Sequence, residues 1–293
     1  MSMRKRLPDV PPPMHLWEGA GGLTIAGDSW GDPRGPLVVL QHGGGQTRHA
    51  WKNAGQTLGN AGYHAIAFDA RGHGDSEWAP DGNYTMDAMA EDLRCVVAAC
   101  GGGRPVLVGA SMGGGTSLVA LGEGRLDAAA LILVDIAPRM EMEGVSKIDA
   151  FMRQKPEGFE TLEEAAEAIS NYQPHRRPPK NLDGLAKNLR LDDSGKYRWH
   201  WDPNFWRWDA SKGHRDVEER FQACARRLTL PTLLVRGGMS DVLSEDGVRE
   251  FQDLCPHAEY VNVVEAGHMV AGDRNDVFAK AVKDFLARTV PAN

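Results

Sequence analysis

The sequence predicts an α/β protein built on a mostly parallel sheet with helices on both faces. Short runs rich in β-forming residues alternate with helical patterns along the 293 residues. These runs are almost continuously apolar, which is typical of parallel strands that are buried on both faces. The alternation is interrupted once by a long segment. Before this segment, one serine follows an apolar run and lies between closely spaced glycines. Together these observations indicate one α/β core domain with an insertion.

Seven apolar runs are expected to form strands. They are LTIAGDSW at 23–30, PLVVLQH at 36–42, HAIAFDA at 64–70, PVLVGA at 105–110, AALILVD at 129–135, PTLLVRGG at 231–238 and AEYVNVVEAG at 258–267. Two sets of residues fall on single helical faces, namely Met86, Met89, Leu93, Val96 and Cys100, and Val277, Ala281, Phe285 and Leu286. Functional sites in parallel sheets form at the carboxyl ends of the strands, so this edge is the expected site.

The interruption spans residues 138–226 and is expected to be a mainly helical cap. The core domain then consists of residues 1–137 and 227–293. Four of the eight tryptophans lie within ten residues of the stretch YRWHWDPNFWRW in this segment. Trp206 and Trp208 are candidate substrate contacts. The alternative is that these tryptophans only fasten the cap to the core.

Composition excludes several classes of partner. The formal net charge of −7 gives no general attraction to nucleic acid or anionic membranes. The first residues, MSMRKRLPDVPPPM, lead into prolines and not into an apolar segment, and no run of about twenty apolar residues follows. The four cysteines lack CxxC spacing and are expected to be reduced. We therefore expect a soluble cytoplasmic protein whose oligomeric state the sequence leaves undetermined.

Ser111 is the candidate nucleophile. It follows an expected strand and is flanked by Gly109 and Gly113, which gives the spacing G-x-S-x-G. A sharp turn from strand to helix needs small residues at these two positions, and it exposes the serine at its apex. The alternative is a glycine-rich turn that merely contains a serine.

A serine nucleophile needs a base and an acid that orients the base. His268 follows the last expected strand and is the candidate base. Asp241 follows the preceding expected strand and is the preferred acid. Asp135 also ends a strand, in LVDIAP, and remains the alternative acid.

A tetrahedral intermediate also needs hydrogen-bond donors for its oxyanion. The backbone N–H of Met112, directly after the serine, is one expected donor. The second is expected from the glycines of LQHGGGQTRHAW, with Gly44 favoured and Gly43 or Gly45 as alternatives. His42 is interpreted as a structural hydrogen-bonding residue.

Five motifs resemble the α/β-hydrolase superfamily: HGGGQTRHAW, FDARGHGDS, VGASMGGG, RGGMSD and EAGHM. The resemblance covers residues 20–137 and 227–288 and is greatest to the capped esterase, cofactor-free peroxidase and epoxide-hydrolase-like branch. It implies an eight-stranded fold, a triad of Ser111, His268 and Asp241, and an acyl-enzyme. Epoxide hydrolases and haloalkane dehalogenases have aspartate where Ser111 stands. Perhydrolases have a proline shortly after the HG pair, where this chain has Gly44 and Gly45.

The predicted function is hydrolysis of carboxylic esters by a serine hydrolase, with lactones and thioesters as further candidates. The expected partner is a small ester-type molecule, and no cofactor or metal is expected because the zinc motifs and the phosphate-loop lysine are missing. One alternative is C–C bond hydrolysis with the same triad, although Ala110 stands where that family has asparagine. The other is a ligand receptor that keeps the triad but turns over slowly.

Overall fold

A computed structural model of the chain describes residues 5–172, 182–205, 214–273 and 275–292. Eight strands form the main sheet in the order β11-β10-β7-β6-β4-β5-β3-β2. The six strands from β4 to β11 in this sheet run parallel, whereas β3 is antiparallel to both β5 and β2. The expected eight-stranded α/β fold is confirmed. The strands of this sheet are β2 (His15–Glu18), β3 (Thr24–Trp30), β4 (Leu37–Gln41), β5 (His64–Phe68), β6 (Val106–Ala110), β7 (Ala130–Val134), β10 (Thr232–Gly237) and β11 (Glu259–Val263).

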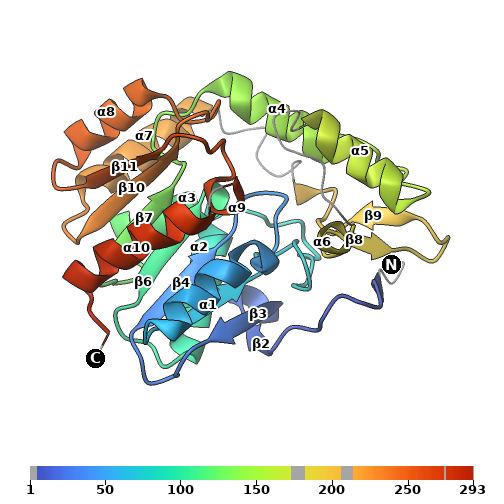
Figure 1. Ribbon diagram of the computed structural model, residues 1–293, viewed down its shortest axis with the longest axis horizontal. Coiled ribbons are helices and arrows are strands. Elements are labelled where there is room, and N and C mark those ends of the chain that lie inside the picture. Colours follow the sequence, from blue (N-terminus) through green and yellow to red (C-terminus); the bar gives the residue numbers. More distant parts are fainter. Residues whose placement is uncertain (1–4, 173–181, 206–213, 274, 293) are drawn as a thin grey trace.

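Helices cover both faces of the sheet (Figure 1). One face packs on α1 (Lys52–Asn60) and α10 (Asn275–Thr289), which contact each other. The other face packs on α2 (Met86–Ala99), α3 (Met112–Gly122), α7 (His214–Arg226) and α8 (Glu245–Leu254). The short elements at the sheet edge are η1 (Ala20–Gly22), η2 (Arg48–Trp51) and α9 (Val270–Asp273).

The strand sequences explain this arrangement. Along β6, Leu107 packs into one apolar cluster, while Val106 and Val108 pack into the other. Side chains that alternate between two buried faces require the nearly continuous apolar runs seen in the sequence. Of the eight strands of the main sheet, β2 is the one that the residue pattern did not indicate, and its outward Leu16 is 65% exposed.

The inserted segment 138–226 is divided between a cap layer and the main core. Its first part holds α4 (Met142–Arg153), α5 (Leu162–Tyr172), α6 (Asp183–Ala186), β8 (Leu189–Leu191) and β9 (Tyr197–Trp199). Figure 1 shows α4 and α5 running past the edge of the main sheet toward β8 and β9. The described residues from 142 to 205 form the cap layer. By contrast, α7 packs on α3 and belongs to the main core.

The cap layer has its own small core and sheet. Strand β8 lies between β9 and β1 (Lys5–Arg6), so residues near the start of the chain complete this sheet. An apolar cluster separate from the main core includes Met152, Phe159 and Trp201. Among the described residues, no helix combines the length and hydrophobicity needed to cross a membrane.

Candidate active site

Ser111 lies at a sharp turn between β6 and α3. Its backbone has φ 46° and ψ −113°, a conformation that costs energy in any residue with a side chain. A Cβ at Gly109 would lie 2.4 Å from the backbone of Gly113, and one at Gly113 would lie 2.6 Å from Gln41 Cβ. The predicted need for glycine on both sides of the serine is therefore met.

His268 is oriented by Asp135. Asp135 directly follows β7, is completely buried, and accepts a hydrogen bond from His268 Nδ1 at 2.7 Å. Ser240 Oγ donates to the same carboxylate oxygen at 2.5 Å, and the Gly237 N–H donates to the other oxygen at 2.8 Å. Because a carboxylate accepts, the proton of His268 lies on Nδ1 and its Nε2 retains a lone pair.

The prediction that Asp241 orients His268 is wrong in this structure. The Asp241 side chain is 52% exposed and pairs with Lys147 of α4 at 3.2 Å. The turn after β10 explains the difference. Ser240 Oγ donates to Asp135 and accepts from the N–H groups of Val242 and Leu243, so this turn faces the sheet edge through residue 240. Asp241 then lies on the outer side of the turn.

One sequence feature could have separated the two acids. Both follow strands that are neighbours in the sheet, so position along the edge does not distinguish them. Asp135 comes immediately after its strand, whereas Asp241 lies further along a turn whose strand ends at Gly237. Asp135 also has a positive φ of 51°, which aspartate tolerates better than most residues.

The turn after β4 lies beside Ser111 and presents a backbone donor. A Cβ at Gly43 would lie 3.3 Å from Ser111 Cβ. The Gly43 N–H donates to Gln46 Oε1 and the Gly45 N–H donates to His73 Nε2, each at 3.2 Å. Within the described part of the chain, the Gly44 N–H has no such partner. Of the three glycines, Gly44 is therefore the one whose amide is available to a ligand.

The first amide of α3 is available as well. Met112 follows Ser111, and its N–H is one of those at the start of a helix that have no carbonyl of the helix to bond. The positive end of the helix dipole lies at the same place. Met112 and Gly44 both line the cavity described below, together with Ser111.

His42 has a structural role in this turn, as the sequence indicated. It is buried, its Nδ1 donates to the Gly43 carbonyl at 2.8 Å, and its Nε2 accepts from the Ala70 N–H at 2.9 Å. Burial lowers the pKa of its ring, which keeps it neutral. Both ring nitrogens are occupied, so His42 is not a second base.

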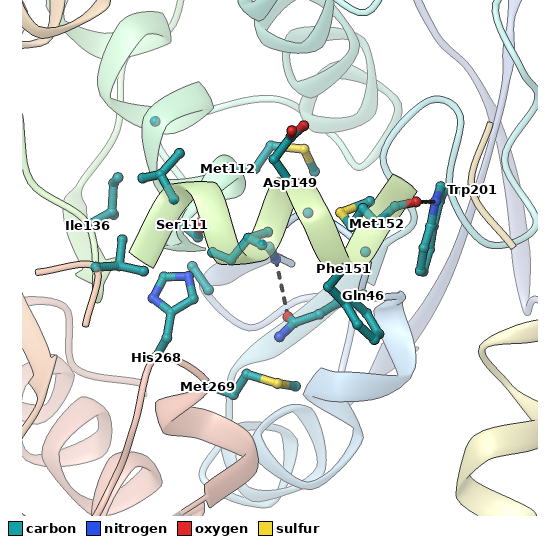
Figure 2. Close-up of a pocket in the computed structure, with 18 of the residues that line it drawn as sticks. Gln46, Ser111, Met112, Ile136, Asp149, Phe151, Met152, Trp201, His268 and Met269 are labelled. Carbon is teal, nitrogen blue, oxygen red and sulfur yellow. Dashed lines mark hydrogen bonds between the residues drawn. The ribbon is translucent and has the colours of Figure 1, made fainter. Parts of the chain in front are cut away.

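A cavity of about 1200 Å³ connects these groups to the cap layer. Figure 2 shows Ser111, Ile136 and His268 at one end of it, and Phe151, Met152 and Trp201 toward the other. The lining is mainly apolar and includes Met86, Met140, Phe151, Met152, Trp201 and Phe205. The two tryptophans proposed from the sequence, Trp206 and Trp208, lie outside the described residues. Trp199 and Trp201 of the same cluster line the cavity and stack on each other at 5.0 Å.

The fold and this constellation are those of an α/β hydrolase. A sequence model of the alpha/beta hydrolase fold family matches residues 36–274. The chain belongs to this family, as its five motifs indicated.

Several known relatives are named as esterases or lipases. The chain is 29% identical over 275 residues to the esterase Rv0045c of Mycobacterium tuberculosis. This alignment covers 90% of this chain and 86% of the relative. It is also 29% identical over 268 residues to the mouse sn-1-specific diacylglycerol lipase ABHD11, with 88% and 83% covered. A solved structure of the M. tuberculosis esterase superposes with a TM-score of 0.72 at 26% identity, covering 94% of this chain and 93% of the other. The chain is thus an esterase-like hydrolase.

Proposed function

We propose that the protein hydrolyses carboxylic esters through an acyl-enzyme on Ser111, with His268 as base and Asp135 as the acid that orients it. The observation that carries the proposal is the 2.7 Å hydrogen bond between His268 Nδ1 and Asp135, at the cavity that Ser111 lines. A buried carboxylate that holds one ring nitrogen leaves the other to take a proton from a nucleophile.

The reaction has two halves. Ser111 Oγ attacks the ester carbonyl carbon while its proton moves to His268 Nε2, and the tetrahedral intermediate then expels the alcohol, which takes that proton. In the second half, His268 removes a proton from water, and the resulting hydroxide attacks the acyl group. The acid leaves, and the proton returns to Ser111 Oγ. Asp135 remains ionised and stabilises the imidazolium that forms in each half.

The Gly44 and Met112 N–H groups are the proposed oxyanion hole. Both are backbone donors at the cavity wall beside Ser111, and both are without a protein partner among the described residues. Backbone donors that are already oriented stabilise developing charge without reorganisation. The dipole of α3 adds to the same effect.

The substrate we propose is an ester with a bulky apolar group. The cavity is larger than the roughly 300–1,000 Å³ typical of small-molecule sites. Its methionines adapt their shape easily, which suits flexible chains of variable length. We also propose that the cap layer sets substrate choice, since α4 and α5 supply Ile148, Phe151, Met152 and Ile169 to the wall.

The decisive experiment is labelling with a fluorophosphonate, combined with Ser111→Ala. The wild type is expected to be labelled on Ser111, and the variant is expected to lose both the label and about 10⁴-fold or more of its turnover. Its melting temperature should change little, because a half-buried hydroxyl is removed from a turn. Ser170→Ala on α5, outside the cavity lining, serves as the matched control. A Ser111→Ala variant that keeps ester turnover, or a wild type that stops after one equivalent of product, would contradict the proposal.

A further inference from the structure

One histidine of the cap layer reaches the turn Gly43–Gln46, which carries the proposed oxyanion donor Gly44 and is called the oxyanion turn below. His200 is 1% exposed, and its Nε2 donates to the Gly45 carbonyl at 3.2 Å. On the other side of the ring, Nδ1 accepts from the Gly74 N–H at 2.8 Å. The two bonds together require a neutral ring with its proton on Nε2. Burial, with a further contribution from His73 nearby, lowers the pKa of His200 well below its ordinary value.

The same glycine is held from two further sides. Its N–H donates to His73 Nε2 at 3.2 Å, so both of its backbone polar groups bond to imidazoles. A Cβ at Gly45 would lie 3.1 Å from Met152 Sδ, which shows how closely α4 approaches it. Gly45 has φ 73° and is the third residue of the turn that the Gln46 N–H closes on the Gly43 carbonyl at 3.1 Å. In such a turn the two central residues move together, so fixing Gly45 also fixes Gly44.

The rings of His42, His73 and His200 form a continuous buried contact from the core to the cap layer. His73 lies 5.3 Å from His42 and 5.7 Å from His200, measured between ring centroids. His42 and His73 come from the core, whereas only His200 belongs to the cap layer. The orientation of the Gly44 amide therefore depends on a side chain of the segment that also forms the substrate wall.

We infer that His200 is a positioning residue for ester hydrolysis, which fixes the Gly43–Gln46 turn through its bond to the Gly45 carbonyl and thereby aims the Gly44 N–H at the oxyanion. This inference rests on the proposed function. It assigns the cap layer a part in transition-state stabilisation as well as in substrate choice. Misplacement of such a donor weakens binding of the transition state more than binding of the ground state.

Two conservative variants separate the bonds that His200 makes. In His200→Gln, the side-chain amide nitrogen can occupy the place of Nε2 and still donate to Gly45. In His200→Asn, the amide oxygen can occupy the place of Nδ1 and accept from Gly74, but nothing reaches Gly45. Asp202→Asn is the matched control, because the Asp202 carboxylate accepts from the Tyr84 hydroxyl and the Asn204 N–H and, among the described residues, makes no hydrogen bond to the oxyanion turn.

The variants are assayed on an acetyl ester, which makes few contacts with the cap layer. For His200→Asn we expect kcat to fall roughly 10- to 100-fold with KM changed less than about twofold, and for His200→Gln we expect most of kcat to remain. Inhibition by a trifluoromethyl ketone, whose adduct with serine carries an oxyanion, should weaken in parallel with kcat. Asp202→Asn should lower the melting temperature while keeping kcat and the affinity for the ketone.

Equal kcat for the folded Asn and Gln variants overturns the inference, as does a loss that follows melting temperature across all three variants. If His200→Asn does not fold, His200→Gln decides, since loss of its affinity for the ketone overturns the inference and retention supports it. Ser111→Ala is assayed on the same ester. Turnover that survives in Ser111→Ala rejects the proposed function itself, whatever the His200 variants show.

Discussion

The sheet edge and the cap layer contribute differently to the same cavity. Ser111, Asp135 and His268 each follow a parallel strand, and the backbone bonds of neighbouring strands fix where those strands end. The cap layer supplies apolar side chains from helices that pack on their own small cluster. Precise placement of reacting groups thus comes from the sheet, and the shape of the wall comes from the insertion. We therefore propose that the chemistry belongs to the sheet edge and that substrate selectivity belongs mainly to the cap layer.

The largest expected effect tests the assignment of chemistry to the sheet edge. Asp135→Asn should lower kcat by about 10⁴-fold, because an amide favours the wrong tautomer of His268. Asp241→Asn is the matched control, since Asp241 pairs with exposed Lys147 at the surface. It should leave turnover within a few fold, as surface ion pairs contribute only about 0–1 kcal/mol. Steady-state kinetics of both variants on one ester provides the measurement, and the reverse ranking would restore Asp241 as the acid.

A smaller effect tests the assignment of selectivity to the cap layer. Phe151 of α4 lines the cavity (Figure 2). Its ring stacks on that of Tyr172, with ring centroids 4.3 Å apart. Phe151→Ala should weaken binding of the transition state for long-chain esters by about 1–3 kcal/mol, which lowers kcat/KM roughly 10- to 200-fold. The kcat/KM for acetyl esters should stay nearly unchanged. A panel of p-nitrophenyl esters of increasing chain length measures the ratio, with Phe151→Leu as the conservative control. An equal fractional loss on every ester would mean that Phe151 does not select among substrates. The same panel with Trp206→Ala and Trp208→Ala tests the tryptophans predicted from the sequence.

The smallest effect, that of removing one buried ring, concerns the contact between the two regions. Burial lowers the pKa of His42, His73 and His200, for His73 to about 3. Below about pH 6.5 the unfolded chain takes up protons at these rings and the folded chain does not, so the free energy of unfolding decreases as pH falls toward the folded pKa values. Each ring contributes up to about 1.4 kcal/mol per pH unit. The pKa of buried Asp69 is lowered by Arg48 against the effect of burial, so this neighbouring carboxylate titrates below that range.

Urea unfolding at pH 7.5, 6.5 and 5.5 measures this effect. The wild type should lose stability between pH 6.5 and 5.5, and His200→Gln should show a shallower dependence because it has one titrating ring fewer. A wild-type unfolding free energy that stays constant over the three values would show that the rings do not link folding to protonation.

The sheet and the sharp turn at Ser111 could be predicted because local sequence determines them. The continuous apolar runs of β4 to β7 are typical of strands buried on two sides, and Gly109 and Gly113 meet a steric need within a few residues. The position of His268 at the carboxyl edge of the sheet could be predicted because this residue follows β11. Each of these predictions uses residues that are close in the sequence.

The remaining features depend on contacts between distant residues. Its place directly after β7 favours Asp135, but the exclusion of Asp241 depends on how the turn at Ser240 faces, and that turn lies more than a hundred residues from Asp135. The strands β8 and β9 of the cap layer are only three residues each, and β8 pairs with a strand near the start of the chain. His200 could not be linked to Gly45 for the same reason, since 155 positions separate them.

The backbone at Ser111 and Asp135 has a consequence for engineering of the enzyme. Both residues have a positive φ, of 46° and 51°, which glycine would adopt without a steric penalty. A non-glycine residue in such a conformation costs on the order of 1–3 kcal/mol. Selection for heat resistance alone would therefore favour glycine at Ser111, whereas at Asp135 the three hydrogen bonds that the buried carboxylate accepts oppose this change. Libraries screened for thermal tolerance need a simultaneous assay of ester cleavage, so that improved stability is not obtained by removing the proposed nucleophile.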